Sequence, residues 1–297
     1  MQRNINAKKM PVLYENVAVH FALAVGVAMV TVRQKRQGSK MDWSFGLTVT
    51  QVLVAIGVTL FASFVKGAVG FAMPMIMMSG LGSFLPAETA LAALILPTIA
   101  TNISQSLRQG RAAAMASVWR YRLMIAMILI FIALSAQLVL LIPQALFYAL
   151  LGVPILLFAI SQLAGWQLVI PVENRNRAEV ITGVVAGLYG GVSGIWGPPV
   201  LVYLLSTGVA KQENMRIQGV VFLLGAIVLL VAHLQSGVFA GDRAALSALL
   251  VPVAMAGLYA GFWLQDRLDA ARFRRWTLVV LALTALNLIR RAWVLLG

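Results

Sequence analysis

The chain has 297 residues, of which 61% are hydrophobic and only 11% are charged, and its mean hydropathy is +0.91. Soluble globular domains contain roughly 45–50% apolar and about 25% charged residues, so the polar residues here are too few to cover a water-soluble core. The absence of cysteine excludes a disulfide scaffold, thiolate catalysis and cysteine-bound metals. The composition predicts an all-α, polytopic transmembrane helix bundle, and we expect neither a metal nor a cofactor.

The formal net charge of +14 comes from arginines and lysines that gather in short clusters between apolar runs. Such clusters are typical of cytoplasmic loops beside an anionic membrane leaflet. A nucleic-acid-binding domain would instead interleave basic and aromatic residues on one surface, and no such region is present in the sequence. We therefore expect the lipid bilayer as the chain's surroundings and no nucleic acid as a partner.

Ten apolar segments follow residue 43, and most approach the 20 or so residues that a spanning helix needs. They are 44–65, 68–85, 87–107, 123–142, 145–170, 178–193, 198–209, 214–234, 244–264 and 276–296. Three of them, 68–85, 178–193 and 198–209, are short or interrupted by glycine and proline. Residues 1–43 form an N-terminal extension whose run 11–32 contains Glu15, so it is a weaker candidate for an extra span or an interfacial helix.

The two halves of the remaining chain, 44–175 and 176–297, resemble each other. One register places Gly67 on Gly194 and Gly70 on Gly197, at equivalent points of five segments each. Spaced glycine pairs of this kind indicate an internal repeat. The sequence therefore predicts two transmembrane repeats, each with a broken helix at its glycine-rich motif.

The charges of equivalent loops indicate how the repeats are oriented. The loop after the third segment is basic in the first half (108–122), whereas the loop after the fourth is basic in the second half (265–275). By the positive-inside rule the halves have opposite orientations, which predicts inverted-topology repeats like those of many transporters. Ten spans would leave Arg290 outside, while re-entrant short segments would instead place the 272–275 cluster outside. We prefer ten spans.

The first informative motif is the stretch from Phe64 to Pro74, where Gly67, Gly70 and the proline predict a broken helix. Broken backbone at membrane depth must be buried in protein or line a wet cavity. A half-helix starting near Gly70 would direct free N–H groups at an anion, and Lys66 would add a full charge. The alternative is that Lys66 snorkels to the interface and that the glycines allow close helix packing.

The second motif runs from Gly190 to Pro199 and has the same kind of break. Ser193, Gly194 and the amides around Gly197 would complete an anion site from the opposite side. Trp196 is either a wall of this site or an interfacial anchor.

A polar stripe lies on the segment 87–107. Thr98, Thr101, Asn102 and Gln105 fall at i, i+3, i+4 and i+7, which is one helical face. Such a face turns toward a cavity or another helix, because lipid leaves polar groups unpaired. Asn102 and Gln105 could therefore donate hydrogen bonds to an oxyanion, or they could join helices. Gln218 is a weaker candidate of the same kind.

At its two glycine-rich breaks the chain resembles the sulfite exporter TauE/SafE family, also called the toluene sulfonate uptake permease family. The matching stretches are KGAVGFAMP, from Lys66 to Pro74, and SGIWGPP, from Ser193 to Pro199. The family pattern usually has a further glycine where this chain has Pro198. The resemblance covers roughly 44–296 and implies a multi-pass carrier of a small sulfur-containing anion, such as sulfite or an organosulfonate, in the bacterial inner membrane.

Two other classes of protein remain as alternatives to a carrier that works by alternating access. An anion channel is one, because sequence does not distinguish a pore from a carrier. A rhomboid-like intramembrane protease is the other, since Gly191, Ser193 and Gly194 fit its G-x-S-G pattern and His233 could serve as the base. Motifs this short arise easily in a glycine-rich membrane protein, so we expect a transporter and no enzyme.

Overall fold

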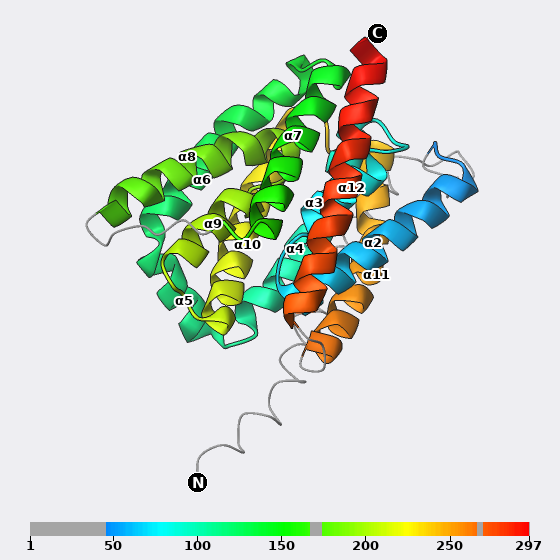
Figure 1. Cartoon of the computed structure of the whole chain (residues 1–297). Helices are drawn as coiled ribbons and strands as arrows, with labels where there is room; N and C mark the ends of the chain where they lie inside the picture. The colour runs from blue at the N-terminus through cyan, green and yellow to red at the C-terminus, as the bar shows by residue number, and fades with distance from the viewer. Residues whose placement is uncertain (1–45, 167–173, 266–269, 297) are drawn as a thin grey trace. The chain divides into compact units, whose positions relative to one another are not determined.

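A computed structural model describes residues 46–166, 174–265 and 270–296, which are helical and contain no strand (Figure 1). The all-helical prediction is therefore confirmed. The helices belong to one compact unit, Leu47–Gly297. In chain order they are α2 (Val49–Val69), α3 (Met73–Leu81), α4 (Ala87–Leu107), α5 (Arg111–Arg120), α6 (Arg122–Ser135) with the 3₁₀ turn η1 (Ala136–Leu141), α7 (Gln144–Leu163), α8 (Arg175–Ser193), α9 (Gly197–Ser206), α10 (Lys211–Gln235), α11 (Gly241–Gln265) and α12 (Ala270–Leu296). The predicted extension, 1–43, lies outside the described residues.

Seven stretches of helix in the described part of the chain are long and apolar enough to cross a membrane. They lie in α2, α4, α6 with η1, α7, α10, α11 and α12. Helices α3 and α9 have only 9 and 10 residues, and a helix of that length covers only about half of a hydrocarbon core that is about 30 Å thick. The prediction of ten full spans is wrong for these two segments, which are half-helices.

Helix α5 is the element that the sequence pattern missed. Its residues were expected to form a loop, 108–122, because alanine and arginine give no apolar run there. Alanine and arginine nevertheless have high helix propensity, and the segment forms a helix of 10 residues between α4 and α6.

Both glycine-rich motifs break their helices, as predicted. Helix α2 ends at Gly70 with φ 90°, and helix α8 ends at Gly194 with φ 70°. Glycine adopts this left-handed conformation without the side-chain clash that other residues meet. Prolines then occupy the first turns of α3 and α9, where a missing backbone N–H costs no helical hydrogen bond. Local sequence thus fixes where each helix ends and the next begins.

The two glycine caps favour another register for the predicted repeats, which themselves stay a prediction. Aligned on the caps, Gly70 falls on Gly194, a shift of three residues from the predicted pairing of Gly67 with Gly194. In this register Gly67 corresponds to Gly191, and both glycines lie against the backbone of another helix. The sequence offered several glycines for alignment, and only the backbone conformation distinguishes the cap from the packing position.

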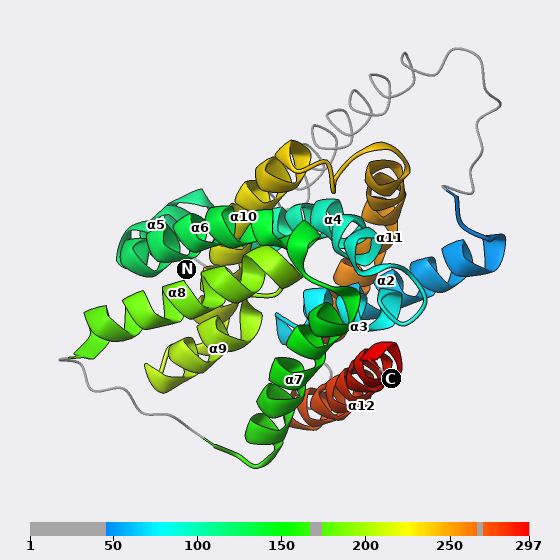
Figure 2. The ribbon, with the colours of Figure 1, turned by 90° about the horizontal axis from the view of Figure 1, so that it is seen from above.

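The observed helix pairs are the ones expected if the two predicted repeats pack against each other. Helix α2 packs against α11, and its counterpart α8 packs against α6; the counterparts α4 and α10 pack against each other, as do α7 and α12. Figures 1 and 2 both show α2 beside α11. Helices of residues 44–175 therefore pack against helices of residues 176–297.

The directions of the counterpart helices α4 and α10 are opposite. Ser106 of α4 lies against Gly219 of α10, and Gln109, two residues beyond the end of α4, donates to the backbone oxygen of Gln212, which comes earlier in α10. Antiparallel counterparts are what inverted-topology repeats require. The arrangement supports the predicted inversion, which remains a prediction.

Glycines allow the closest helix contacts of the bundle. A methyl group at Gly67 of α2 would meet the backbone of Leu258 and Gly261 in α11. On the other side of the bundle, Gly183 and Gly191 of α8 lie equally close to the backbone of α6 and η1. Close approach of this kind is how helices associate in a membrane, where the hydrophobic effect does not drive them together.

Candidate functional site

Lys66 lies in the last turn of α2, with its side chain only 1% exposed. Its Nζ donates to Thr101 Oγ1 at 2.9 Å and also contacts Asn102 Oδ1, both on α4. Thr101 Oγ1 in turn donates to the backbone oxygen of Pro97 at 2.7 Å. The lysine therefore does not reach an interface in this structure, and the snorkelling alternative does not describe it.

The lysine lies at the level of the polar stripe on α4, close to the break that ends α2. Thr101, to which it is bonded, is six residues before the end of α4. The neighbouring Gly67 lies against Gly261, four residues before the end of α11.

Lys66 has no acidic counter-ion in the part of the chain that the structure describes. Glu88 is paired with Arg243 at 3.1 Å, Glu179 with Arg175 at 3.2 Å, and Glu213 with Arg120 and Arg216 at 3.9 and 3.7 Å. An ammonium group buried without an opposite charge is costly, and intramembrane ionisable residues usually mark substrate or ion pathways.

Several buried hydrogen-bond donors around the breaks and the polar stripe lack a protein partner. Asn102 accepts the lysine through Oδ1, and its Nδ2 is unpaired, as is the hydroxyl of Thr98 one turn earlier on α4. Trp196 Nε1 is also unpaired, although the indole is only 2% exposed. A buried polar group without a partner costs about 1–3 kcal/mol.

The indole of Trp196 is fixed by aromatic and glycine contacts. Its ring centroid lies 6.1 Å from that of Phe222, and the rings are nearly perpendicular. The ring also covers Gly190, which is the repeat counterpart of Lys66. The alternative of an interfacial anchor does not fit this buried side chain, so Trp196 forms part of the interior.

Gln105 and Gln218 already use their donors within the protein. Gln105 Nε2 donates to the backbone oxygens of Gly70 at 2.9 Å and of Met215 at 2.8 Å. Gln218 Nε2 contacts Asn214 Oδ1 on its own helix. Gln105 therefore links the break after α2 to α10, and both N–H groups of its amide are used within the protein.

The residues of the second break shape the backbone. Ser193 Oγ donates to the backbone oxygen of Tyr189 at 2.6 Å and accepts from the Ile195 N–H at 3.0 Å. Gly194 supplies the left-handed cap, and Gly197 begins α9. Because Pro198 and Pro199 have no N–H groups, the start of α9 offers fewer free amides than the sequence analysis assumed.

Sequence reasoning named the polar stripe but did not identify its key contacts. Thr101 was noted for its spacing only, yet it is a direct partner of Lys66. Met73 was missed, although its Sδ lies 3.5 Å from Thr101 Oγ1. No sequence signal joins Lys66 to residues 35 positions away, since that contact depends on how α2 and α4 pack.

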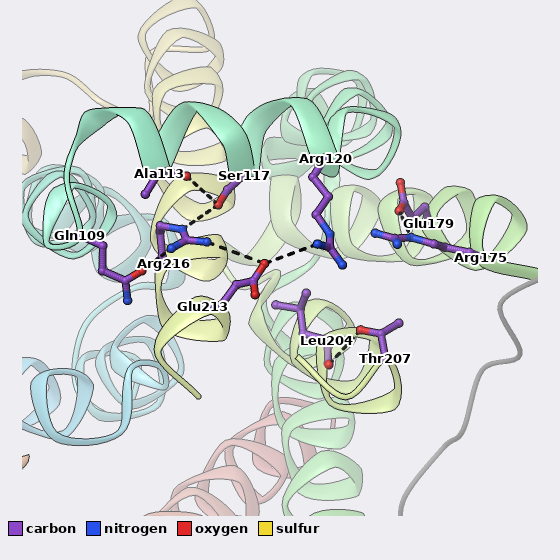
Figure 3. Close-up of polar contacts among 10 residues, drawn as sticks. All are labelled: Gln109, Ala113, Ser117, Arg120, Arg175, Glu179, Leu204, Thr207, Glu213 and Arg216. Carbon is purple, nitrogen blue, oxygen red and sulfur yellow. Dashed lines mark hydrogen bonds and ion pairs between the residues drawn. The ribbon is translucent and has the colours of Figure 1, made fainter. Parts of the chain in front are cut away.

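A second polar network joins α4, α5 and α10 at the basic end of the bundle (Figure 3). Arg216 is at its centre: its Nε donates to Ser117 Oγ at 2.9 Å, and its guanidinium also contacts Gln109 and Glu213. Nearby, burial alone would lower the pKa of Arg175, but the hydrogen bond to Glu179 raises it above the ordinary value. These charges are satisfied within the protein, unlike that of Lys66.

The fold and this site define a polytopic α-helical membrane protein with two broken helices and a buried lysine that has no acidic partner among the described residues. The chain belongs to the sulfite exporter TauE/SafE family, whose model matches residues 53–288. It is therefore a membrane transporter of sulfur-containing anions and not an enzyme. Neither the curated proteins nor the solved structures provide a match.

The family excludes the protease alternative, and the geometry gives it no support. The hydroxyl of Ser193 is engaged with backbone groups of Tyr189 and Ile195. The contact found for His233 Nδ1 is with Ser236, at 3.4 Å, and not with Ser193. The G-x-S-G match is a consequence of glycine-rich helix packing.

Proposed function

We propose that this protein carries a sulfite- or sulfonate-type oxyanion across the cytoplasmic membrane by alternating access, with Lys66 as the charge that binds it. The observation that carries the proposal is a buried lysine with no carboxylate partner among the described residues. An anionic substrate would supply the missing counter-ion. The same charge would exclude inorganic cations.

Buried donors without a protein partner support an oxyanion rather than a halide. Asn102 Nδ2 and Trp196 Nε1 are buried and unpaired, and together with the lysine they offer hydrogen bonds from two helices and one helix break. A sulfite or sulfonate group presents three oxygens, so it can accept from several directions at once. Hydrogen bonds to charged oxygens are stronger and shorter than neutral ones, which would offset loss of the anion's hydration.

The two helix breaks support movement by alternating access. Each break separates a longer helix from a half-helix, α2 from α3 and α8 from α9. The longer helices contact their neighbours through glycine, where small side chains leave little to interlock. We expect each pair of helices on either side of a break to move as one hairpin about the Lys66 site, α2 and α3 with α11, and α8 and α9 with α6. Inverted-repeat carriers move in this way. The basic loops 108–122, 171–177, 210–216 and 265–275 would face the cytoplasm.

Flux into proteoliposomes tests this proposal. A panel of sulfite, thiosulfate, sulfate, a short alkyl sulfonate and an aryl sulfonate would be compared for saturation, competition and trans-stimulation. The carrier predicts saturable flux that a trans-side anion accelerates, whereas linear flux without trans-stimulation would indicate the channel alternative. Folded protein that moves none of these anions would contradict the proposal.

Substitution of the lysine tests its role. Lys66→Gln removes the charge and keeps most of the side-chain length, and Arg290→Gln removes one exposed charge from α12 as a matched control. We expect the first to abolish saturable flux and the second to leave it unchanged. Equal flux in Lys66→Gln and the parent protein would show that the lysine does not bind the anion.

A further inference from the structure

Helix α5 has one face turned away from the bundle. Arg111, Met115 and Trp119 follow one another at intervals of four residues and are all exposed, whereas Ala114 and Ser117 on the opposite face are buried. Met115 and Trp119 are 56% and 64% exposed. Residues four apart lie on one side of a helix, so the exposed side combines two large apolar side chains with a charge.

The buried face of α5 is fixed to α10, and this determines which face points outward. Ser117 Oγ accepts from Arg216 Nε at 2.9 Å, and Arg120 is paired with Glu213 at 3.9 Å (Figure 3). Both partners belong to α10. The exposed side of α5 is therefore held in place by polar contacts on its opposite side.

Exposed tryptophans indicate where α5 lies relative to the membrane. Trp119, Trp166 and Trp263 are 64%, 76% and 65% exposed. Trp166 follows the end of α7 and Trp263 lies near the end of α11, so all three are next to loops that the charge pattern places on the cytoplasmic side. Tryptophan is enriched at the membrane–water interface. Trp119 fits a belt of such residues at that boundary.

The charges on this face favour anionic lipid. Arg111 and Arg122 are exposed, and neither is paired with a carboxylate in the described ranges. Arginines at a membrane surface are attracted to anionic headgroups, and an amphipathic helix with basic flanks binds in the interface plane. We propose that the outward face of α5, formed by Arg111, Met115 and Trp119, lies in the cytoplasmic headgroup region and, together with Arg122 at the start of α6, binds anionic phospholipid headgroups.

The absence of native cysteine makes the position of α5 measurable. A fluorescent label at Met115→Cys would be compared with one at Ile130→Cys. Ile130 is an exposed position eight residues after the start of α6, and it serves as the deep reference. We expect the α5 label to be quenched most by lipids with a nitroxide near the headgroup, and the α6 label by lipids with a deep nitroxide. An α5 label quenched by aqueous iodide alone would overturn the proposal, and so would one shielded from every quencher, which would indicate a protein partner.

Lipid charge is tested with the same label. The emission shift at Met115→Cys would be recorded in phosphatidylcholine nanodiscs with and without phosphatidylglycerol. We expect phosphatidylglycerol to shift the emission to the blue, and we expect Arg111→Gln with Arg122→Gln to remove that shift. Arg290→Gln is the matched control and should keep it. A shift of unchanged size in the double variant would refute the anionic-lipid assignment, even if the label lies in the interface.

Discussion

An aspartate at position 102 would give Lys66 the counter-ion that the structure lacks. Asn102→Asp changes one group of nearly the same shape, and the new carboxylate would lie in hydrogen-bond contact with Nζ. Two unit charges 4 Å apart attract by about 4 kcal/mol at an effective dielectric constant of 20. Desolvation of the new carboxylate removes part of this gain, so we expect a net stabilisation of about 2 kcal/mol.

The same substitution should impair anion binding. The substrate would have to displace an internal carboxylate, and losing about 2–4 kcal/mol of binding free energy weakens affinity roughly 30- to 1000-fold. The expected result is therefore a higher melting temperature together with lost flux. These opposite signs separate a binding role from a structural one, because damage to the fold would lower both quantities.

The assay pairs thermal unfolding in detergent with anion flux in proteoliposomes. Asn214→Asp is the matched control, since Asn214 is a buried amide on α10 that contacts Gln218 rather than Lys66. We expect no stabilisation from this control. Unchanged flux in Asn102→Asp, or a lower melting temperature, would refute the reasoning that Lys66 awaits an external negative charge.

Three further predictions concern the frame around the site, and thermal unfolding checks each of them. Gly67→Ala would press a methyl group into the backbone of α11 and should lower the free energy of unfolding by about 1–3 kcal/mol. Its control is Gly57→Ala, whose methyl group meets nothing within 4 Å and which should be neutral or slightly stabilising. Equal effects of the two substitutions would contradict the packing account. Gln105→Leu removes the donor shared by two buried carbonyls and should cost about 2–4 kcal/mol; an unchanged melting temperature would show that water replaces the amide. Ser247→Ala should cost about 1–2 kcal/mol, because that hydroxyl donates to Ala93 O, which Pro97 leaves without a helical partner; no loss would mean that the carbonyl needs no donor.

Local signals were sufficient for the helix boundaries of the bundle. The segment predicted at 87–107 is helix α4 with the same ends, and the motif glycines correctly mark where α2 and α8 stop. Apolar length, cap glycines and first-turn prolines act through the chain's nearest neighbours. They are therefore readable without knowledge of the tertiary structure.

Contacts between distant residues were not readable in this way. The polar stripe on α4 was found from its spacing, but nothing local indicates that Thr101 and Asn102 hold Lys66 while Gln105 bridges two backbone oxygens. One helical face could serve substrate or packing equally well. The distinction depends on the packing of α2 and α10 against α4, which is a property of the whole bundle.

The two glycine-rich motifs differ in charge at equivalent positions. Lys66 and Gly190 precede the glycine caps Gly70 and Gly194 by the same number of residues, and the backbone oxygen of each accepts the N–H of its cap. Lys66 carries an ammonium group, whereas Gly190 is covered by the indole of Trp196. Under the proposed carrier mechanism, movement of the α2–α3 and α8–α9 hairpins would change the route to Lys66, so the same charge would be approached from either side of the membrane.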